Sequence, residues 1–260
     1  MLTAAQVAEF KRQGFLLGAK VLTDEQVEEL RAELARVIAD TSGRPPQPVL
    51  KRNLSGKDDA PVIQIVNIWE ASPAYARLIR LPVVTGEVAQ LIGARELRVW
   101  HDQIQYKPAE TGGVNMWHQD SPLWPILRPQ TQVTAWFALD DVDPDNGCMS
   151  MVPGSHQWGS QLPFLHEISE FGGMPEKFEQ HRLKVVLRPV RKGHVHYHHG
   201  LVWHGSHANG SGRPRRAIAV HYMGDDTCYN AAGNHVMKQF VTVPDGSQLT
   251  GEHFPRVWPT

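Results

Sequence analysis

Apolar residues change their spacing near Leu97, from a repeat of three or four positions to a repeat of two. A repeat of two is the pattern of a β-strand with one buried face. The runs are short, end at Gly, Pro, Asn or Asp, and cover residues 97–107, 131–139, 149–152, 184–187, 194–198, 217–223 and 239–243. With the segment around His118 they make about eight strands, the number of a double-sheet jelly roll with two Greek keys. The sequence therefore predicts a mainly β protein with a jelly-roll core.

The residues before Leu97 predict helices that flank this core. Thr3 and Gln6 form a capping-box pattern, and Gly14 is placed to end the helix that follows. A second capping box at Thr23 opens a longer helix, whose apolar stripe consists of Val27, Leu30, Leu34 and Ile38. Two further helices are expected from Pro73 to about Leu81 and over residues 84–92.

We expect a single domain over residues 1–260, because β-barrels of this length commonly remain one unit. Its helical N-terminal part covers about 1–95 and its β-barrel core about 96–245. Residues 42–59 are rich in Pro, Gly and charge and predict a loop. Residues 162–181 form a long, weakly helical insertion, which we expect to be a lid over the barrel mouth.

Charge and cysteine content exclude several classes of protein. The chain has 26 basic and 27 acidic residues, a balance that gives no sign of a nucleic-acid or membrane-surface partner. Its apolar runs are too short to span a bilayer. Cys148 and Cys228 lie far apart and are too few for a disulfide framework. A cytoplasmic protein whose partner is a small-molecule substrate is therefore expected.

A metal-ligand pattern stands between a Gly-rich turn and a Pro-rich stretch. In an extended segment His118 and Asp120 point to the same side, and His204 follows on a much later strand. Two imidazoles and one carboxylate, with neighbouring positions left open, suit a non-haem iron(II) oxygenase site. A His-x-Asp triplet alone arises easily by chance, so the prediction depends on the three residues together.

Arg215 follows His204 after eleven residues. Its planar guanidinium can grip a carboxylate with two parallel hydrogen bonds, which lysine cannot do. Arg213 and Arg216 compete for this role, although strand alternation lets only one of Arg215 and Arg216 face inward. We expect residues 209–212 to turn the chain between two antiparallel strands and so to place His204 beside Arg215.

The motifs resemble the phytanoyl-CoA dioxygenase family, which includes ectoine hydroxylase. They lie over residues 114–120, 136–148, 152–156 and 203–217, and the resemblance runs from the N-terminal helix to about Tyr222. That resemblance implies a cupin-like double-stranded β-helix that uses Fe(2+), 2-oxoglutarate and O2. It implies that His118, Asp120 and His204 bind the iron and that Arg215 binds the distal carboxylate of 2-oxoglutarate.

Further residues are expected around the same pocket. The resemblance implies that Ser206, Trp136, Ser121 and a polar residue of the strand 97–107 line it, and we select Gln103 for the last role. Trp117 and Trp124 are candidates for the substrate pocket. Core packing is the commoner role for a residue such as Trp136, Trp117 and Trp124 could equally belong to the core, and Ser206 could be a turn serine. His194, His196 and His198 alternate along one strand face, where a polar sheet face is favoured over a second metal site.

The predicted activity is hydroxylation of an unactivated C–H bond of a small metabolite, with release of succinate and CO2. Asp120 argues against a halogenating relative, because a small residue at that position is what makes room for a halide. Two alternatives stay open. Zinc also accepts two His and a carboxylate, so a cupin-like zinc hydrolase or isomerase is one. A catalytically silent barrel that binds small molecules is the other.

Overall fold

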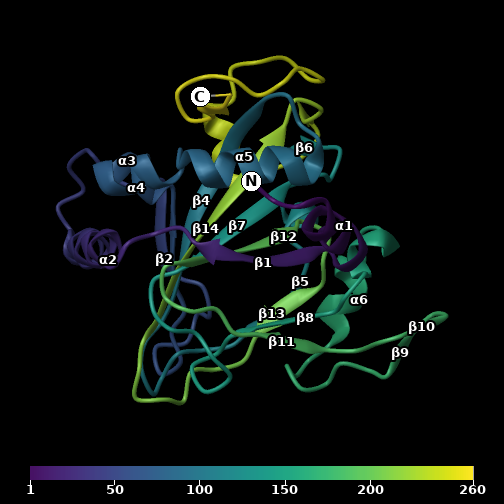
Figure 1. Ribbon diagram of the computed structural model, residues 1–260. Helices are drawn as coiled ribbons and strands as arrows, with labels where there is room; N and C mark the ends of the chain where they lie inside the picture. Colours follow the sequence, from purple (N-terminus) through teal and green to yellow (C-terminus); the bar gives the residue numbers. More distant parts are fainter. Residues whose placement is uncertain (260) are drawn as a thin grey trace.

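The computed structural model describes residues 1–259, and its two largest β-sheets face each other (Figure 1). In the large sheet the order is β1 (Phe15–Lys20), β12 (His194–His199), β7 (Val133–Ala138), β14 (Arg215–Gly224), β4 (Leu97–Lys107), β3 (Ile63–Val66) and β2 (Leu50–Asn53), with β16 (Arg256–Trp258) also paired to β4. The small sheet has the order β11 (Val186–Arg188), β8 (Met149–Met151), β13 (His204–Ser206) and β5 (Asn115–His118). All these pairs are antiparallel, as a jelly roll requires.

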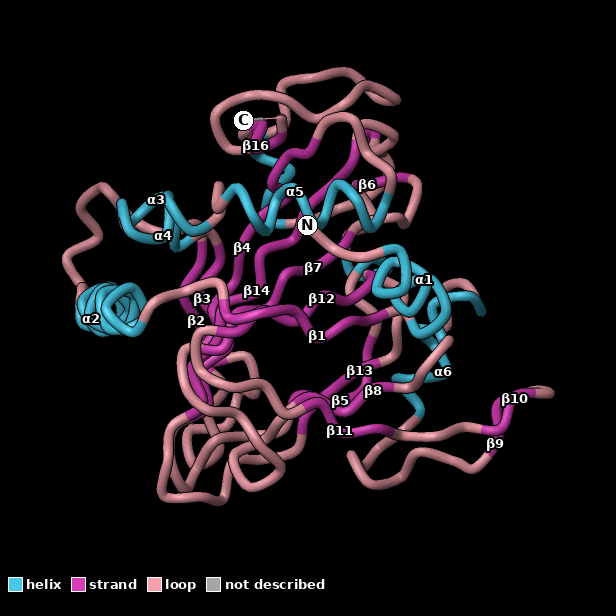
Figure 2. Tube along the Cα trace, viewed as in Figure 1, coloured by secondary structure: helices cyan, strands magenta, loops and turns pink. Residues whose placement is uncertain are grey.

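Five helices lie on the side of the large sheet that faces away from the small sheet (Figure 2). They are α1 (Ala4–Gln13), α2 (Asp24–Ala39), α3 (Ile68–Ala71), α4 (Pro73–Leu78) and α5 (Pro82–Ile92). Alternate residues of the central strands, such as Phe137 and Ile218, pack against these helices in the main hydrophobic core. The intervening residues, such as Trp136 and Ala219, face the small sheet. The space between the sheets is therefore lined from both sides.

The predicted helix starts are confirmed. Thr3 and Thr23 both cap their helices through capping boxes, and Gly14 ends α1 with a φ of 83°. Val27, Leu30 and Leu34 are buried as the stripe predicts, but the fourth fully buried position of α2 is Val37 rather than Ile38. Among residues 1–259 the structure has no helix that is long and apolar enough to cross a membrane.

Two predictions about local structure are wrong. The predicted loop over 42–59 contains β2, which pairs with β3 at the sheet edge, where Leu50 lies opposite Val66. The N-terminal part is mostly helical as expected, although its strands β1, β2 and β3 belong to the large sheet. Residues 239–243 form no strand. The 3-10 helix η3 (Val236–Phe240) takes up the first two residues of that stretch and buries Met237, and residues 241–243 form no regular element.

The turn predicted over residues 209–212 does not join two neighbouring strands. β13 belongs to the small sheet and β14 to the large sheet, so this segment crosses from one sheet to the other. Asn209 holds the crossing, because its side-chain amide donates to the backbone carbonyls of Pro108 and Arg213 at 2.9 and 2.7 Å. His204 and Arg215 consequently approach the same space from opposite sheets.

Residues 162–181 cover the outer face of the small sheet and contribute no residue to the lining of the space between the sheets. The segment contains α6 (Leu162–Glu167) and β9 (Lys177–Phe178), and β9 pairs with β10 (His181–Arg182). Phe171 stacks on Trp117 with ring centroids 5.1 Å apart, and Phe178 packs against Trp203. The expected lid is therefore replaced by an aromatic layer on the far side of the small sheet.

The remaining elements are short. β6 (Leu127–Arg128) pairs with β15 (Cys228–Tyr229), while η1 (Ser121–Leu123) and η2 (Ser155–Trp158) are single 3-10 turns. Of these, η1 matters for the site, because it begins one residue after Asp120 and ends the extended path of β5.

Candidate metal centre

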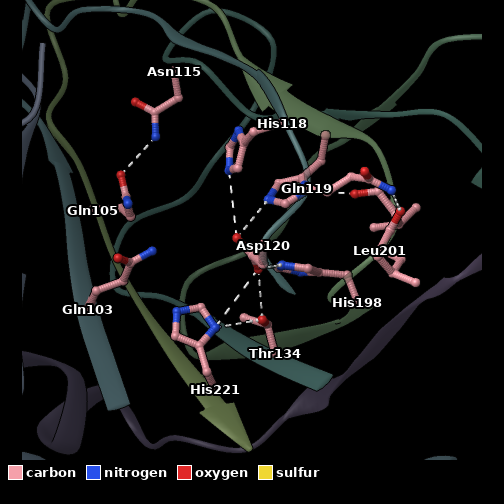
Figure 3. Close-up of polar contacts among 12 residues, drawn as sticks. Gln103, Gln105, Asn115, His118, Gln119, Asp120, Thr134, His198, Leu201 and His221 are labelled. Atoms are coloured by element: carbon pink, nitrogen blue, oxygen red, sulfur yellow. Dashed lines mark hydrogen bonds and ion pairs between the residues drawn. The ribbon is translucent and has the colours of Figure 1, made fainter. Parts of the chain in front are cut away.

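His118, Asp120 and His204 meet between the two sheets. Figure 3 shows the side chains of His118 and Asp120 pointing toward each other. One ligand atom from each lies within 4.8 Å of the others, and the Asp120 Oδ1 atom is 3.7 Å from the Nε2 atom of each histidine. His118 and His204 are directly opposite each other in the β5–β13 pair. Asp120 lies beyond the end of β5, with φ −71° and ψ −56°, so a turn rather than strand alternation returns its carboxylate to the two imidazoles.

Both imidazoles have the tautomer that a metal requires. His118 Nδ1 lies 2.7 Å from the Met116 carbonyl, and His204 Nδ1 lies 3.0 Å from the Val202 carbonyl. Each Nδ1–H donates to that carbonyl, which leaves the Nε2 lone pair directed at the shared point. Burial lowers the pKa of His118 to about 4 and also lowers the pKa of His204. Both rings are therefore neutral near pH 7, the form that binds metal.

Asp120 is ionised although it is buried. Burial alone would raise its pKa, but the imidazoles of His204 and His198 outweigh this effect and hold the pKa well below its usual range. Its Oδ2 atom is 3.1 Å from His198 Nε2 and 3.0 Å from Thr134 Oγ1. The anionic Oδ1 faces the two histidines, so the donor set of two neutral nitrogens and one carboxylate fits a divalent iron.

Arg215 supplies a buried positive charge beside this centre. Its side chain is 1% exposed and forms no ion pair within residues 1–259, and its Nε–H has no hydrogen-bond acceptor there. Its guanidinium carbon lies 5.0 Å from the ring centroid of Trp136. Burial lowers the pKa of Arg215 to about 10, so the group remains charged at neutral pH. A buried, unpaired guanidinium fits an anionic ligand, because its charge otherwise stays uncompensated.

The competing arginines are engaged elsewhere. Arg216 points to the other face of β14 and donates to Asp140 at 2.7 and 2.9 Å, while Arg213 pairs with Asp143 at 2.7 Å. Ser206 lies on β13 near Arg215, and its buried hydroxyl also has no partner in the described residues. The orphaned donors of Arg215 and Ser206, together with the wall of Trp136, fit the distal carboxylate and the chain of 2-oxoglutarate.

Comparison with known proteins agrees with this geometry. The family model described as phytanoyl-CoA dioxygenase matches residues 10–217. The chain belongs to the phytanoyl-CoA dioxygenase family. It is 26% identical over 249 residues to the peroxisomal phytanoyl-CoA dioxygenase of Mus musculus, covering 90% of this chain and 72% of that protein. It is 30% identical over 155 residues to the ectoine dioxygenase of Nocardia farcinica, covering 58% of this chain and 50% of that protein.

One solved structure is similar over almost the whole of this chain. The non-heme alpha ketoglutarate dependent carbocyclase SnoK from nogalamycin biosynthesis is 29% identical, with a TM-score of 0.81 over 98% of this chain and 96% of that one. The family, the jelly-roll fold and the enzyme class predicted from the sequence are thereby confirmed. The protein is an iron(II)- and 2-oxoglutarate-dependent dioxygenase of the phytanoyl-CoA dioxygenase family.

Three residues that we predicted for the pocket lie outside it. The Ser121 hydroxyl donates to Gln132 at 2.9 Å, because η1 turns it away from the iron ligands. Trp117 points to the outer face of the small sheet, where its indole donates to the Phe171 carbonyl at 2.8 Å. Trp124 packs in the core with Trp100 and contacts His221, behind the lining residues. Gln103, Trp136, Ser206 and Arg215 do line the space around the iron ligands.

Several other residues that line the pocket around the iron ligands were not predicted from the sequence. Asn115 donates to Gln105 at 2.8 Å, and the pair forms one wall of the pocket beside Gln103. His198 and His221 line it next to Asp120. The sequence favours a polar sheet face for His198, but Val195 and Tyr197 on the other face of β12 are fully buried in the helix-covered core. The alternation of apolar residues with histidines in this strand could have predicted this, because it places His196 and His198 on the face toward the space between the sheets.

His199, a half-buried histidine outside the iron ligands, gives the protein a pH-dependent stability. Burial lowers the pKa of His199 to about 4, below the ordinary value of 6.5. The unfolded chain therefore binds a proton that the folded protein does not, and stability falls as the pH drops from 6.5 toward 4. In metal-free protein, the His199→Asn variant should lose less stability over this range, by at most about 1.4 kcal/mol per pH unit. Urea unfolding at several pH values measures this, and equal slopes in both proteins would contradict it.

Proposed function

We propose that this protein hydroxylates a small molecule, with iron(II) held by His118, Asp120 and His204 and with 2-oxoglutarate held by Arg215 and Ser206. The observation that carries the proposal is the buried, unpaired Arg215 beside a neutral His, His, carboxylate donor set. A zinc hydrolase would need the same three ligands but has no use for an unpaired guanidinium beside them. Bound iron(II) and 2-oxoglutarate together would supply an oxidant from O2, with succinate and CO2 as products.

The residues of this chain bind and orient rather than perform redox chemistry. Arg215 would grip the distal carboxylate through its planar fork, and Ser206 would add one hydroxyl donor. Trp136 would cover the carbon chain, since its ring already lies against the guanidinium. Lys107 is fully buried below this region and donates to the Ser206 carbonyl at 3.1 Å. It would thus fix the backbone that presents the Ser206 hydroxyl.

We propose a substrate that carries hydrogen-bonding groups. The wall formed by Gln103, Gln105 and Asn115 presents side-chain amides to the pocket. Gln64 extends this wall to the next strand, where it donates to Gln103 at 2.7 Å. A purely hydrocarbon substrate would leave the Asn115 side-chain oxygen, which has no donor in the described residues, without compensation. A small polar metabolite therefore suits the pocket better than an alkyl chain.

Ring formation is a second candidate outcome. The carbocyclase SnoK is similar over almost the entire chain, and closing a ring uses the same iron and co-substrate as hydroxylation. The two outcomes differ in mass, because hydroxylation adds one oxygen atom to the substrate whereas ring closure removes two hydrogen atoms. Mass spectrometry of the product distinguishes them.

The class of reaction is tested without knowing the substrate. Iron(II)-loaded protein is titrated with 2-oxoglutarate under anaerobic conditions, and the visible charge-transfer band of the chelate is recorded. We expect a saturable band, followed by slow release of succinate after exposure to oxygen. Zinc-loaded protein is the control and should give neither signal. Protein that holds one iron but gives no band with 2-oxoglutarate would contradict the proposal and favour the zinc alternative.

We also propose that the chain acts as one dioxygenase domain, since strands from its first ninety-five residues pair within the same sheet as the core strands. A cytoplasmic location remains a prediction. It rests on Cys148 and Cys228, which form no disulfide in the described part of the chain.

A further inference from the structure

The distal oxygen of Asp120 has its own set of hydrogen-bond donors (Figure 3). Oδ2 lies 3.0 Å from Thr134 Oγ1 on β7 and 3.1 Å from His198 Nε2 on β12. His221 on β14 lies 2.7 Å from the Thr134 hydroxyl and 3.9 Å from Oδ2. All four side chains are buried, and they come from three adjacent strands of the large sheet and from the turn after β5.

We propose that Thr134 and His198 are positioning residues that fix Asp120 so that only Oδ1 is offered to the metal. This proposal rests on the assignment of Asp120 as an iron ligand. A carboxylate can bind a metal through one or both oxygens. Two donors on Oδ2 hold that oxygen away from the shared point, while Oδ1 stays 3.7 Å from His118 and from His204. The coordination position that a second carboxylate oxygen would occupy is thereby kept open.

The positions of the hydrogen atoms follow from counting donors. The Thr134 hydroxyl has one hydrogen, which can point to Asp120 or to His221. If it pointed to His221, the lone pairs of the hydroxyl and of the carboxylate would face each other at 3.0 Å in a buried site. The favourable arrangement therefore has His221 Nδ1–H donating to Thr134, and Thr134 donating to Asp120. His198 donates through its Nε2–H, so two hydrogen bonds hold the same carboxylate oxygen.

These donors orient the carboxylate through hydrogen bonds to one of its two oxygens. Groups that orient a metal ligand in this way commonly change metal affinity by 10- to 100-fold when they are removed.

The test compares the iron(II) affinity of matched variants under anaerobic conditions. Thr134→Val keeps the shape and removes the hydroxyl, whereas Thr134→Ser keeps the hydroxyl. His198→Phe removes the donor, whereas the side-chain amide of His198→Gln can replace Nε2–H. We expect iron(II) affinity to fall about 10- to 100-fold in the Val and Phe variants and to stay within about threefold of the wild type in the Ser and Gln variants.

A second signal separates positioning from general damage to the fold. If Asp120 rotates to bind through both oxygens, the charge-transfer band with 2-oxoglutarate should weaken or shift in Thr134→Val even at saturating iron. His196→Phe is the control, because His196 lies on the same face of β12 but does not contact Asp120. It should leave both the affinity and the band unchanged.

The outcomes are distinguishable. If the wild type binds no iron(II), the proposed function fails. If the wild type binds iron(II) and Thr134→Val binds it equally well with an unchanged band, the positioning role is wrong. If the Ser variant loses as much affinity as the Val variant, the hydroxyl is not the active feature and the proposal is also wrong. Should His198→Phe not fold, the Thr134 pair alone decides the question.

Discussion

Replacing Asp120 with alanine is expected to abolish iron(II) binding and 2-oxoglutarate turnover together. Asp120 is the only anionic group of the three proposed ligands, and its Oδ1 atom lies 3.7 Å from each of the two Nε2 atoms. Without it, two neutral imidazoles face each other across the site with no charge to balance a divalent cation. Such a pair binds iron(II) weakly, and the facial geometry that leaves neighbouring positions open is lost.

The measurement is the iron content of protein loaded anaerobically and desalted, together with succinate release. The wild type should hold one iron per chain, and the Asp120→Ala variant should hold none after desalting. Asp226→Ala is the control, because it makes the same replacement at an exposed carboxylate outside the site. An Asp120→Ala variant that retained stoichiometric iron and turnover would transfer the role of third ligand to another group. Circular dichroism of the metal-free proteins checks that the fold is intact.

Replacing Arg215 with alanine should weaken 2-oxoglutarate binding and leave iron binding unchanged. The guanidinium is 1% exposed and has no anionic partner in residues 1–259. A charge pair made in such a buried place costs about 2–5 kcal/mol when one partner is removed. At about 1.4 kcal/mol for each tenfold change, this is roughly a 30-fold to several thousand-fold rise in the dissociation constant. The dissociation constant of Arg215→Lys for 2-oxoglutarate should lie between those of the wild type and Arg215→Ala, because lysine keeps the charge but lacks the planar guanidinium.

The neighbouring Arg216 provides a matched control for this prediction. Arg216→Ala makes the same change one residue away, but Arg216 donates to Asp140 on the opposite face of β14. We expect this variant to be less stable in urea and to bind 2-oxoglutarate with the affinity of the wild type. The dissociation constant is read from the charge-transfer band in the anaerobic titration. If Arg216→Ala bound 2-oxoglutarate more weakly while Arg215→Ala bound it as the wild type does, the roles of the two arginines would be exchanged.

The strands and the helix starts could be predicted from the sequence because they depend on local patterns. The repeat of two after Leu97 and the capping boxes at Thr3 and Thr23 each act within a few residues. Failures occurred where a pattern was weak or short. β2 is a four-residue strand in a stretch rich in charge, and it forms because β3 offers an open edge.

Strand alternation also predicted part of the site. Because neighbouring residues of a strand face opposite sides, only one of Arg215 and Arg216 could face inward. The structure places Arg215 on the inner face and pairs Arg216 with Asp140 outside. Ser121 was expected at the pocket from the resemblance, and Trp117 was a candidate because it lies beside the ligands. Trp117 is next to His118 in the strand, so alternation turns its side chain to the opposite face. There it stacks on Phe171, which comes from a segment more than fifty residues away.

The sequence alone determined the types of ligand, the strand pattern and the enzyme class, because each depends on residue identity or on spacing along a short segment. Only the tertiary structure decided how those residues combine. The crossing held by Asn209 sends β13 and β14 to different sheets, so His204 and Arg215 meet across a cavity instead of along a hairpin. Likewise, Thr134, His198 and His221 gather around Asp120 because β7, β12 and β14 are neighbours in the large sheet. Strand order is set by long-range pairing and burial, which no local pattern in the chain encodes.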